Sequence, residues 1–283
     1  MALALLLGGL VLAACLPPKP APPKPAVPVT IATTTTTTTV DPAPPGAGSI
    51  MGPSTLTAAQ IAAYVCHVNH CPATPATPDS WKPALSPTAM AQLYIDEGNL
   101  VGVRGDIAFC QSVLETGWFA WSGSFSHLND PPVAPTDAAY TQFPGYVLPS
   151  DHNYDGIGAY SGSNVFMRQP TEQLGVRAQL QHLRNYADAT STPDNLGAPF
   201  VPRPGYTTTN FTTFVYHGKA PNWVDLDGKW AVPGTTYGQT ILQICNSMRT
   251  FSGLAPIAIP AASGASAQSE FVPFDPSQVT FRN

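Results

Sequence analysis

The sequence predicts a mainly α-helical domain over residues 54–253, and three observations support this fold class. Apolar residues recur at helical spacing in five separate segments of this region. The 43% hydrophobic content is enough for a real core. The flanking regions differ sharply in composition, since residues 16–53 are rich in Pro and Thr and residues 254–283 in Ala, Pro and Ser. We therefore expect a linker, a helical domain and a disordered tail.

The first two predicted helices have recognisable start signals. Thr57 and Gln60 have the spacing of a capping box, which opens the first helix. Ser86 followed by Pro87 supplies an N-cap and a proline at the first helical position of the second. Glycine commonly follows the last turn of a helix, so the second helix is expected to end near Gly98.

Three more helices follow at later positions in the chain. The third is expected to begin near Asp106 and to stop at Gly117, the fourth to start at Thr171, and the fifth to end before Gly253. The periodic apolar residues of the five helices are Ile61, Tyr64, Val65; Met90, Leu93, Tyr94; Ile107, Cys110, Leu114; Val176, Leu180, Leu183, Ala187; and Ile241, Ile244, Cys245, Met248, Phe251. Residues 120–165 and 190–235 contain many turn-forming residues, which predicts loops and short hairpins.

The N-terminal segment MALALLLGGLVLAAC is apolar and ends in small residues before Cys15. It is shorter than the roughly 20 residues that span a bilayer and is typical of an export signal. Leu12 to Cys15 also resembles a bacterial lipobox, in which the cysteine is acylated. We expect residues 1–15 to be a signal peptide and Cys15 to carry a lipid anchor into the membrane; a plain secretory signal is the alternative.

Four further cysteines, Cys66, Cys71, Cys110 and Cys245, are an even number in an exported chain, which predicts disulfides. Three connectivities are possible. We favour Cys66–Cys71, which are close in sequence, and Cys110–Cys245, which lie on predicted core helices. The run CHVNHC also holds zinc-ligand types, but four ligands within six residues leave little freedom for a tetrahedral site. No metal and no cofactor are expected.

Charge and motifs exclude several classes of function. The net charge is −5 and the pI near 5.6, so the chain lacks the basic footprint of a nucleic-acid-binding protein. The sequence contains neither a phosphate-binding loop, nor a dinucleotide fingerprint, nor the nucleophile elbow of an α/β-hydrolase.

One carboxylate stands in an unusual place. Glu115 falls in the last turn of the third predicted helix, where the helix dipole disfavours a negative charge. Apolar residues at 113–114 and 118–119 would also exclude water. Both effects raise a carboxyl pKa toward neutrality, as a general acid for glycoside cleavage requires. Taken alone, these features are a weak signal, and an ordinary solvated helix-end glutamate is the commoner explanation.

The segment RGDIAFCQSVLETGWF, residues 104–119, resembles the catalytic helix of bacterial glucosaminidase domains of glycoside hydrolase family 73. The similarity continues in the family's order through HNYDGIGA (152–159), GVRAQLQHLRNYA (175–187) and DLDGKWAVPGTTYGQTIL (225–242). The resemblance implies a lysozyme-like α+β fold with a small β-lobe and long loops beside the cleft. It also implies an endo-β-N-acetylglucosaminidase that cleaves the N-acetylglucosaminyl-β-1,4-N-acetylmuramic acid bond of peptidoglycan, with Glu115 as general acid.

The family places a second carboxylate on its β-lobe, some tens of residues after the acid. Asp130, Asp137, Asp151 and Asp155 fall within that window. Asp151 is the preferred candidate, because polar residues flank it and it directly precedes the HNYDGIGA turn. Alternatively, the N-acetyl group of the substrate acts as nucleophile and no second carboxylate attacks.

Candidate substrate-contacting residues either offer a flat aromatic face to a sugar ring or lie in the predicted turn beside the cleft. They are Trp118, Asn153, Tyr154, Gly156, Trp230 and Tyr237. Each aromatic residue could instead belong to the core, and the asparagine could simply form the turn.

Two other functions remain open at this point. A muramidase or lytic transglycosylase would use the same scaffold and a single glutamate. A non-catalytic wall-binding module would keep the aromatic residues but would not need Glu115. The expected partners are peptidoglycan strands and, through Cys15, the membrane; the domain would face the cell wall.

Overall fold

A computed structural model describes residues 46, 48–71, 77–121, 143–144, 147–157, 165–202, 208–231 and 234–260. All of them belong to one unit of the chain, Pro42–Asn283. The predicted signal peptide with Cys15, most of the linker and residues 261–283 lie outside the described residues.

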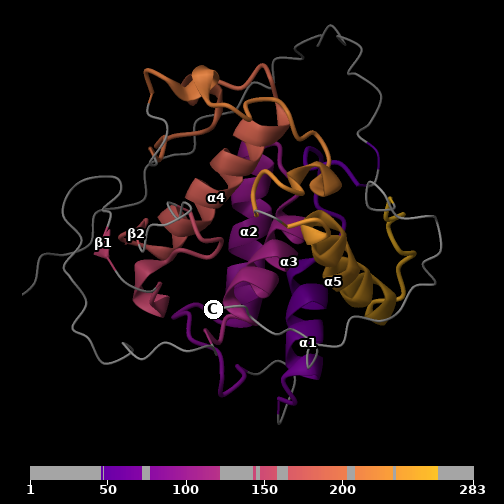
Figure 1. Ribbon diagram of the computed structural model, residues 1–283. Helices are drawn as coiled ribbons and strands as arrows, with labels where there is room; N and C mark the ends of the chain where they lie inside the picture. The colour runs from indigo at the N-terminus through magenta and orange to yellow at the C-terminus, as the bar shows by residue number, and fades with distance from the viewer. Residues whose placement is uncertain are drawn as a thin grey trace, which may run out of the picture. The chain divides into compact units, whose positions relative to one another are not determined.

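Five α-helices dominate this unit (Figure 1), which confirms the mainly α-helical prediction. The helices are α1 (Ala58–Val68), α2 (Pro87–Val101), α3 (Gly105–Thr116), α4 (Glu172–Ala187) and α5 (Tyr237–Phe251). Strands β1 (Phe143–Pro144) and β2 (Val165–Phe166) form one short antiparallel pair. Short 3-10 helices are found at Pro149–Asp151, Pro193–Asn195, Phe211–Thr213 and Trp223–Leu226. Most of the region expected to form a β-lobe lies outside the described residues.

Local capping signals set the helix starts as predicted. The Thr57 hydroxyl accepts a hydrogen bond from the Gln60 backbone at 3.2 Å, and the Gln60 side chain accepts one from the Thr57 backbone at 2.9 Å. The predicted end of α2 at Gly98 was wrong, because the helix continues to Val101 and Gly102 adopts the left-handed cap with φ 72°. A Cβ on Gly98 would lie 2.6 Å from a backbone oxygen, so this glycine permits close packing.

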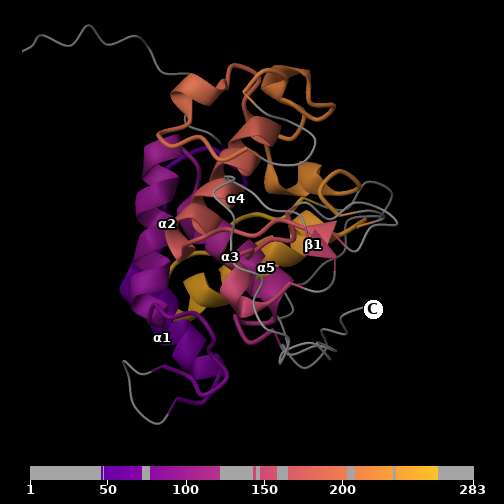
Figure 2. The same cartoon turned by 90° about the vertical axis from the view of Figure 1, so that its left-hand side faces the viewer.

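Helix α3 is the central element of the described unit. It packs against α2 and α5, and more lightly against α4. Figure 1 and Figure 2 both show it between α2 and α5. All of its residues are buried except Leu114 and Glu115, which are partly buried. Because the helix is enclosed by others, Glu115 near its C-terminal end is held on a rigid support.

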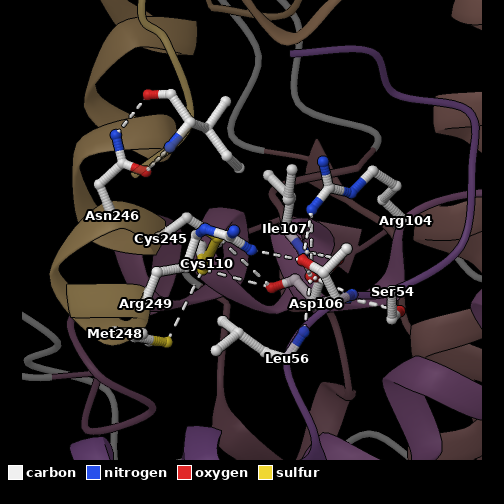
Figure 3. A network of polar contacts seen from close by, with 12 residues as sticks. Ser54, Leu56, Arg104, Asp106, Ile107, Cys110, Cys245, Asn246, Met248 and Arg249 are labelled. Atoms are coloured by element: carbon white, nitrogen blue, oxygen red, sulfur yellow. Dashed lines mark hydrogen bonds and ion pairs between the residues drawn. A yellow bond between two sulfur atoms is a disulfide. The ribbon is translucent and has the colours of Figure 1, made fainter. Parts of the chain in front are cut away.

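The N-terminal end of α3 is fixed by a buried charge (Figure 3). The Asp106 carboxylate accepts hydrogen bonds from the backbone of Thr55 at 2.8 Å and of Leu56 at 3.1 Å. Arg104 forms an ion pair with it at 3.2 Å. These partners compensate the cost of burying the carboxylate and tie the chain before α1 to α3.

Two disulfides have the favoured pairing, Cys66–Cys71 and Cys110–Cys245. The second joins α3 to α5, as Figure 3 shows. Since the sulfurs of Cys66 and Cys71 are bonded to each other, they are not thiolate ligands, and the zinc-site alternative is not supported.

The folded region extends beyond the predicted limits of 54 and 253. Ile50 is fully buried, and its backbone donates a hydrogen bond to Pro221 and accepts one from Arg104, both at 2.9 Å. At the other end, the Asn246 side chain bonds both backbone groups of buried Ile257. Residues 254–260 are therefore part of the fold, and the prediction that disorder begins at 254 was wrong.

No helix in the described part of the chain is both long enough and apolar enough to cross a membrane.

Candidate active site

Glu115 and Tyr237 meet at the ends of two helices. Glu115 lies in the last turn of α3 and is only partly buried, and Tyr237 is the first residue of α5. The Tyr237 hydroxyl donates a hydrogen bond to Oε1 of Glu115. The Cys110–Cys245 disulfide joins the same two helices and holds them in register.

The environment of this pair favours a protonated carboxyl group. Burial raises the pKa of Glu115 from 4.5 to about 7, although the hydrogen bond from Tyr237 acts in the opposite direction. The sequence predicted a shift in this direction. Burial, followed by the nearby charge of Glu115, raises the pKa of Tyr237 well above 10. Near neutral pH, Tyr237 therefore remains protonated, whereas Glu115 can both bind and release its proton.

A turn of the chain lies against the second oxygen of Glu115. Gly156 has φ +71°, and a Cβ placed there would be 3.9 Å from Glu115 Oε2. A glycine adopts this left-handed conformation without the steric cost of a side chain. The structure thus brings Glu115, Tyr237 and Gly156 together from three separate segments, as three of the sequence-predicted site residues.

Asp155 belongs to the same neighbourhood. Its side chain is buried with the turn, and its negative charge contributes to the raised pKa of both Tyr94 and Tyr237. Asp155 is not among the causes of the raised pKa of Glu115, so its electrostatic link to the site runs through Tyr237.

The preferred second carboxylate, Asp151, has a different environment. It is fully buried, and Oδ1 pairs with Arg168 at 2.6 and 2.7 Å. Oδ2 accepts a hydrogen bond from the Leu148 backbone at 2.7 Å. Both oxygens are therefore used to hold the loop together, which does not suit the catalytic role predicted for Asp151. The candidates Asp130 and Asp137 lie outside the described residues.

Two predicted substrate contacts have structural roles instead. The Asn153 side chain is buried and bonds the backbone of Ile157, at 2.9 and 3.0 Å, and of Met167 at 2.9 Å. It forms the turn, as the alternative interpretation held. Tyr154 is fully buried, with its ring 5.7 Å from that of Phe119. Neither side chain offers a surface to a glycan.

The two predicted tryptophan platforms lie in different surroundings. Trp118 follows the end of α3 with φ 64°, is 9% exposed, and its ring is 6.0 Å from that of Tyr64 in α1. Trp230 is partly exposed and packs 4.7 Å from the His182 ring on α4.

Sequence reasoning missed the polar residues behind this pair. Gln111 donates a hydrogen bond to the Tyr237 oxygen at 2.9 Å and accepts one from Gln179 at 2.9 Å. Gln111 precedes Glu115 by one helical turn, so it lies on the same face of α3. That spacing was the available signal. Among the described residues, no group of three or more His, Cys, Asp or Glu side chains could hold a metal ion.

Comparisons with known proteins supply little further information. No family model matches the chain, and no solved structure matches it. The chain is 30% identical over 142 residues to a protein of Borreliella burgdorferi that is named only as an uncharacterized protein. The match covers 50% of this chain, and the chain spans about half the length of that relative (53%). Site geometry and the sequence motifs therefore carry the functional conclusion.

Proposed function

We propose that the protein is a peptidoglycan hydrolase, an endo-β-N-acetylglucosaminidase with Glu115 as its general acid. The observation that carries this proposal is the state of Glu115: its pKa is raised to about 7, one oxygen is bound by Tyr237, and the other lies beside the Gly156 turn. The resemblance of residues 104–119, 152–159, 175–187 and 225–242 to family 73 glucosaminidases supplies the substrate class. The lysozyme-like scaffold with its β-lobe belongs to the proposal.

The arrangement suits proton donation to a leaving oxygen. A glycosidic oxygen leaves poorly unless it is protonated, so the donor must still hold a proton at working pH. Glu115 meets that requirement through burial. As it loses the proton, the hydrogen bond from Tyr237 becomes charge-assisted and roughly twice as strong. The bond therefore stabilises the transition state more than the ground state.

The second catalytic role falls to Asp155 or to the substrate itself. Asp151 is committed to Arg168, whereas Asp155 lies in the turn beside Glu115 and acts electrostatically on Tyr237. If the N-acetyl group of the substrate attacks the anomeric carbon, Asp155 would orient it or stabilise the positive charge that develops.

The proposed location is outside the cytoplasm, at the membrane and facing the wall. Two disulfides fit an oxidising compartment. A lipid on Cys15, followed by the Pro/Thr-rich linker, would place the domain on a tether of roughly 100 Å at about 3.1 Å per residue. Replacing Cys15 by Ser should release the protein from membranes in fractionation, and an unchanged membrane fraction would refute the anchor.

The test of the activity is a digest of purified peptidoglycan followed by reduction and mass analysis of the new ends. N-acetylglucosamine ends support the proposal. Muramic acid ends indicate a muramidase and anhydromuramic ends a lytic transglycosylase. Binding without cleavage by the wild type indicates a wall-binding module. Glu115→Gln, which keeps the shape of the side chain, controls for contaminating hydrolases.

A further inference from the structure

We propose that Gln179 and Gln111 are positioning residues that fix the direction of the Tyr237 hydroxyl proton and so place the acidic proton of Glu115 on Oε2. The inference rests on the proposed role of Glu115 as general acid. It is drawn from a chain of buried polar side chains that runs from α2 and α4 through α3 to α5.

The chain is continuous in hydrogen bonds. Oε1 of Gln179 accepts from Tyr94 at 2.8 Å and from Ser112 at 2.9 Å. Nε2 of Gln179 donates to Oε1 of Gln111 at 2.9 Å, and Nε2 of Gln111 donates to the Tyr237 oxygen at 2.9 Å. Tyr237 then donates to Glu115.

A backbone carbonyl sets the direction of the whole chain. An amide side chain can be turned over, and its orientation is assigned from the partners it meets. Nε2 of Gln179 also donates to the carbonyl oxygen of Ala108 at 3.2 Å, and a carbonyl oxygen can only accept. Gln179 must therefore direct its NH₂ group, and not its oxygen, toward Gln111.

The next links follow from that orientation. Gln111 meets a donor at its oxygen, so its own NH₂ group faces Tyr237. Because the Tyr237 oxygen already receives a hydrogen bond, its single proton is free to point at Glu115. Each hydrogen bond thus determines which group donates and which accepts in the next one.

Glu115 therefore has two chemically distinct oxygens. Oε1 always meets a donor, so the neutral acid carries its proton on Oε2. Oε2 is the oxygen beside Gly156, where a Cβ would lie within 3.9 Å. The series of hydrogen bonds from Gln179 through Gln111 and Tyr237 to Glu115, the relay, thus places the proton on the oxygen that lies beside the Gly156 turn. We expect the substrate to approach from that side if Glu115 is the acid.

Burial keeps the donors and acceptors of these hydrogen bonds from exchanging roles. Gln111, Gln179, Tyr94 and Ser112 are all fully buried, so bulk water does not compete for their hydrogen bonds. The titratable groups that face the relay are Glu115 from α3, Tyr237 from α5, Tyr94 from α2, and Tyr154 and Asp155 from the 152–156 turn. Burial, with the charge of Asp155 adding to it, raises the pKa of Tyr94 and Tyr237, so both remain proton donors.

The test measures the pKa of Glu115 by carbon-13 NMR of its carboxyl group, which requires no substrate. Gln179→Met keeps the side-chain volume but removes the amide that donates to the Ala108 carbonyl and to Gln111. The Gln111 amide can then turn over and accept from Tyr237, so a neutral Glu115 can also carry its proton on Oε1 and donate it to the Tyr237 oxygen. We expect its pKa to rise by about 0.5 to 1 unit, the value of one neutral hydrogen bond. Gln111→Met should give a similar shift, and the double variant should shift no further, because both act through the same hydroxyl.

Ser112→Ala is the matched control. It removes a hydroxyl from the same network but leaves Tyr94, the Ala108 carbonyl and the link to Gln111 in place, so the pKa of Glu115 should not move. In turnover, Gln179→Met should lower kcat about three- to tenfold, the fold-change that corresponds to the expected pKa shift, with KM unchanged. An unshifted pKa in folded Gln179→Met and Gln111→Met, or an equal shift in Ser112→Ala, would overturn the relay. A wild-type protein that cleaves no glycan would instead overturn the proposed function, without affecting the NMR result.

Discussion

Replacing Glu115 by Gln should make the protein more stable at high pH. In the folded protein the pKa of Glu115 is about 7, against 4.5 for an ordinary glutamate. Below pH 4.5 the group is neutral in both states and has no effect. Between these values the unfolded chain loses the proton and the folded one keeps it, so stability falls as pH rises. Above pH 7 the full cost is present, up to about 3 kcal/mol at about 1.36 kcal/mol per pKa unit.

The assay is urea denaturation of wild type and Glu115→Gln at pH 4, 6 and 8. Glutamine accepts the same hydrogen bond from Tyr237 and has no charge to bury, so the variant should gain relative stability between pH 4 and pH 8. Asp96→Asn, which removes an exposed carboxylate on α2, is the control and should show no such gain. Two results would refute the burial of Glu115. One is a difference in unfolding free energy between Glu115→Gln and wild type that is the same at pH 4 and pH 8. The other is a Glu115→Gln variant that is less stable than wild type at pH 8.

Three further predictions concern neighbouring groups. Asp151→Asn breaks the buried pair with Arg168 and should lower the free energy of unfolding by about 3–5 kcal/mol in urea titrations; lost hydrolysis with unchanged stability would restore its catalytic role. Replacing both Cys110 and Cys245 by Ala should cost about 2–4 kcal/mol, measured in the same way, whereas an unchanged midpoint would mean the bridge is not formed. Asp155→Asn should reduce peptidoglycan hydrolysis by at least about 10²-fold with the fold retained in circular dichroism, and a loss below threefold would leave the second role to the substrate.

The helix framework was predictable because its signals are local. The capping box at Thr57, the N-cap at Thr171 and the left-handed cap at Gly117 each act within one turn of the chain, and all three hold. The end of α2 was wrongly predicted at Gly98, because this glycine is needed for close packing against the backbone around Gly105 and not as a helix cap. That packing depends on how the following helix folds back, which the local sequence does not show.

The site was only partly predictable for a related reason. Glu115, Tyr237 and Gly156 could be named from the sequence, because each lies in a recognisable motif, and the structure brings them together. The hydrogen-bond partners of Asp151 and Asn153 could not be predicted, since Arg168 and Met167 lie 17 and 14 residues away and the pairings depend on the tertiary fold. The relay could not be read in advance for the same reason: Gln179 lies on another helix, 68 residues after Gln111.

The most direct test of the central proposal is the rate at which Glu115→Gln cleaves purified peptidoglycan, measured against wild type across pH after circular dichroism confirms folding. If Glu115 is the general acid, the variant should lose about 10²- to 10⁴-fold in rate. The wild-type activity should fall at high pH with a midpoint near the Glu115 pKa of about 7, because the ionised carboxylate has no proton to give. A folded variant within about threefold of wild type, with the same high-pH decline, would contradict the proposal and place the acid elsewhere.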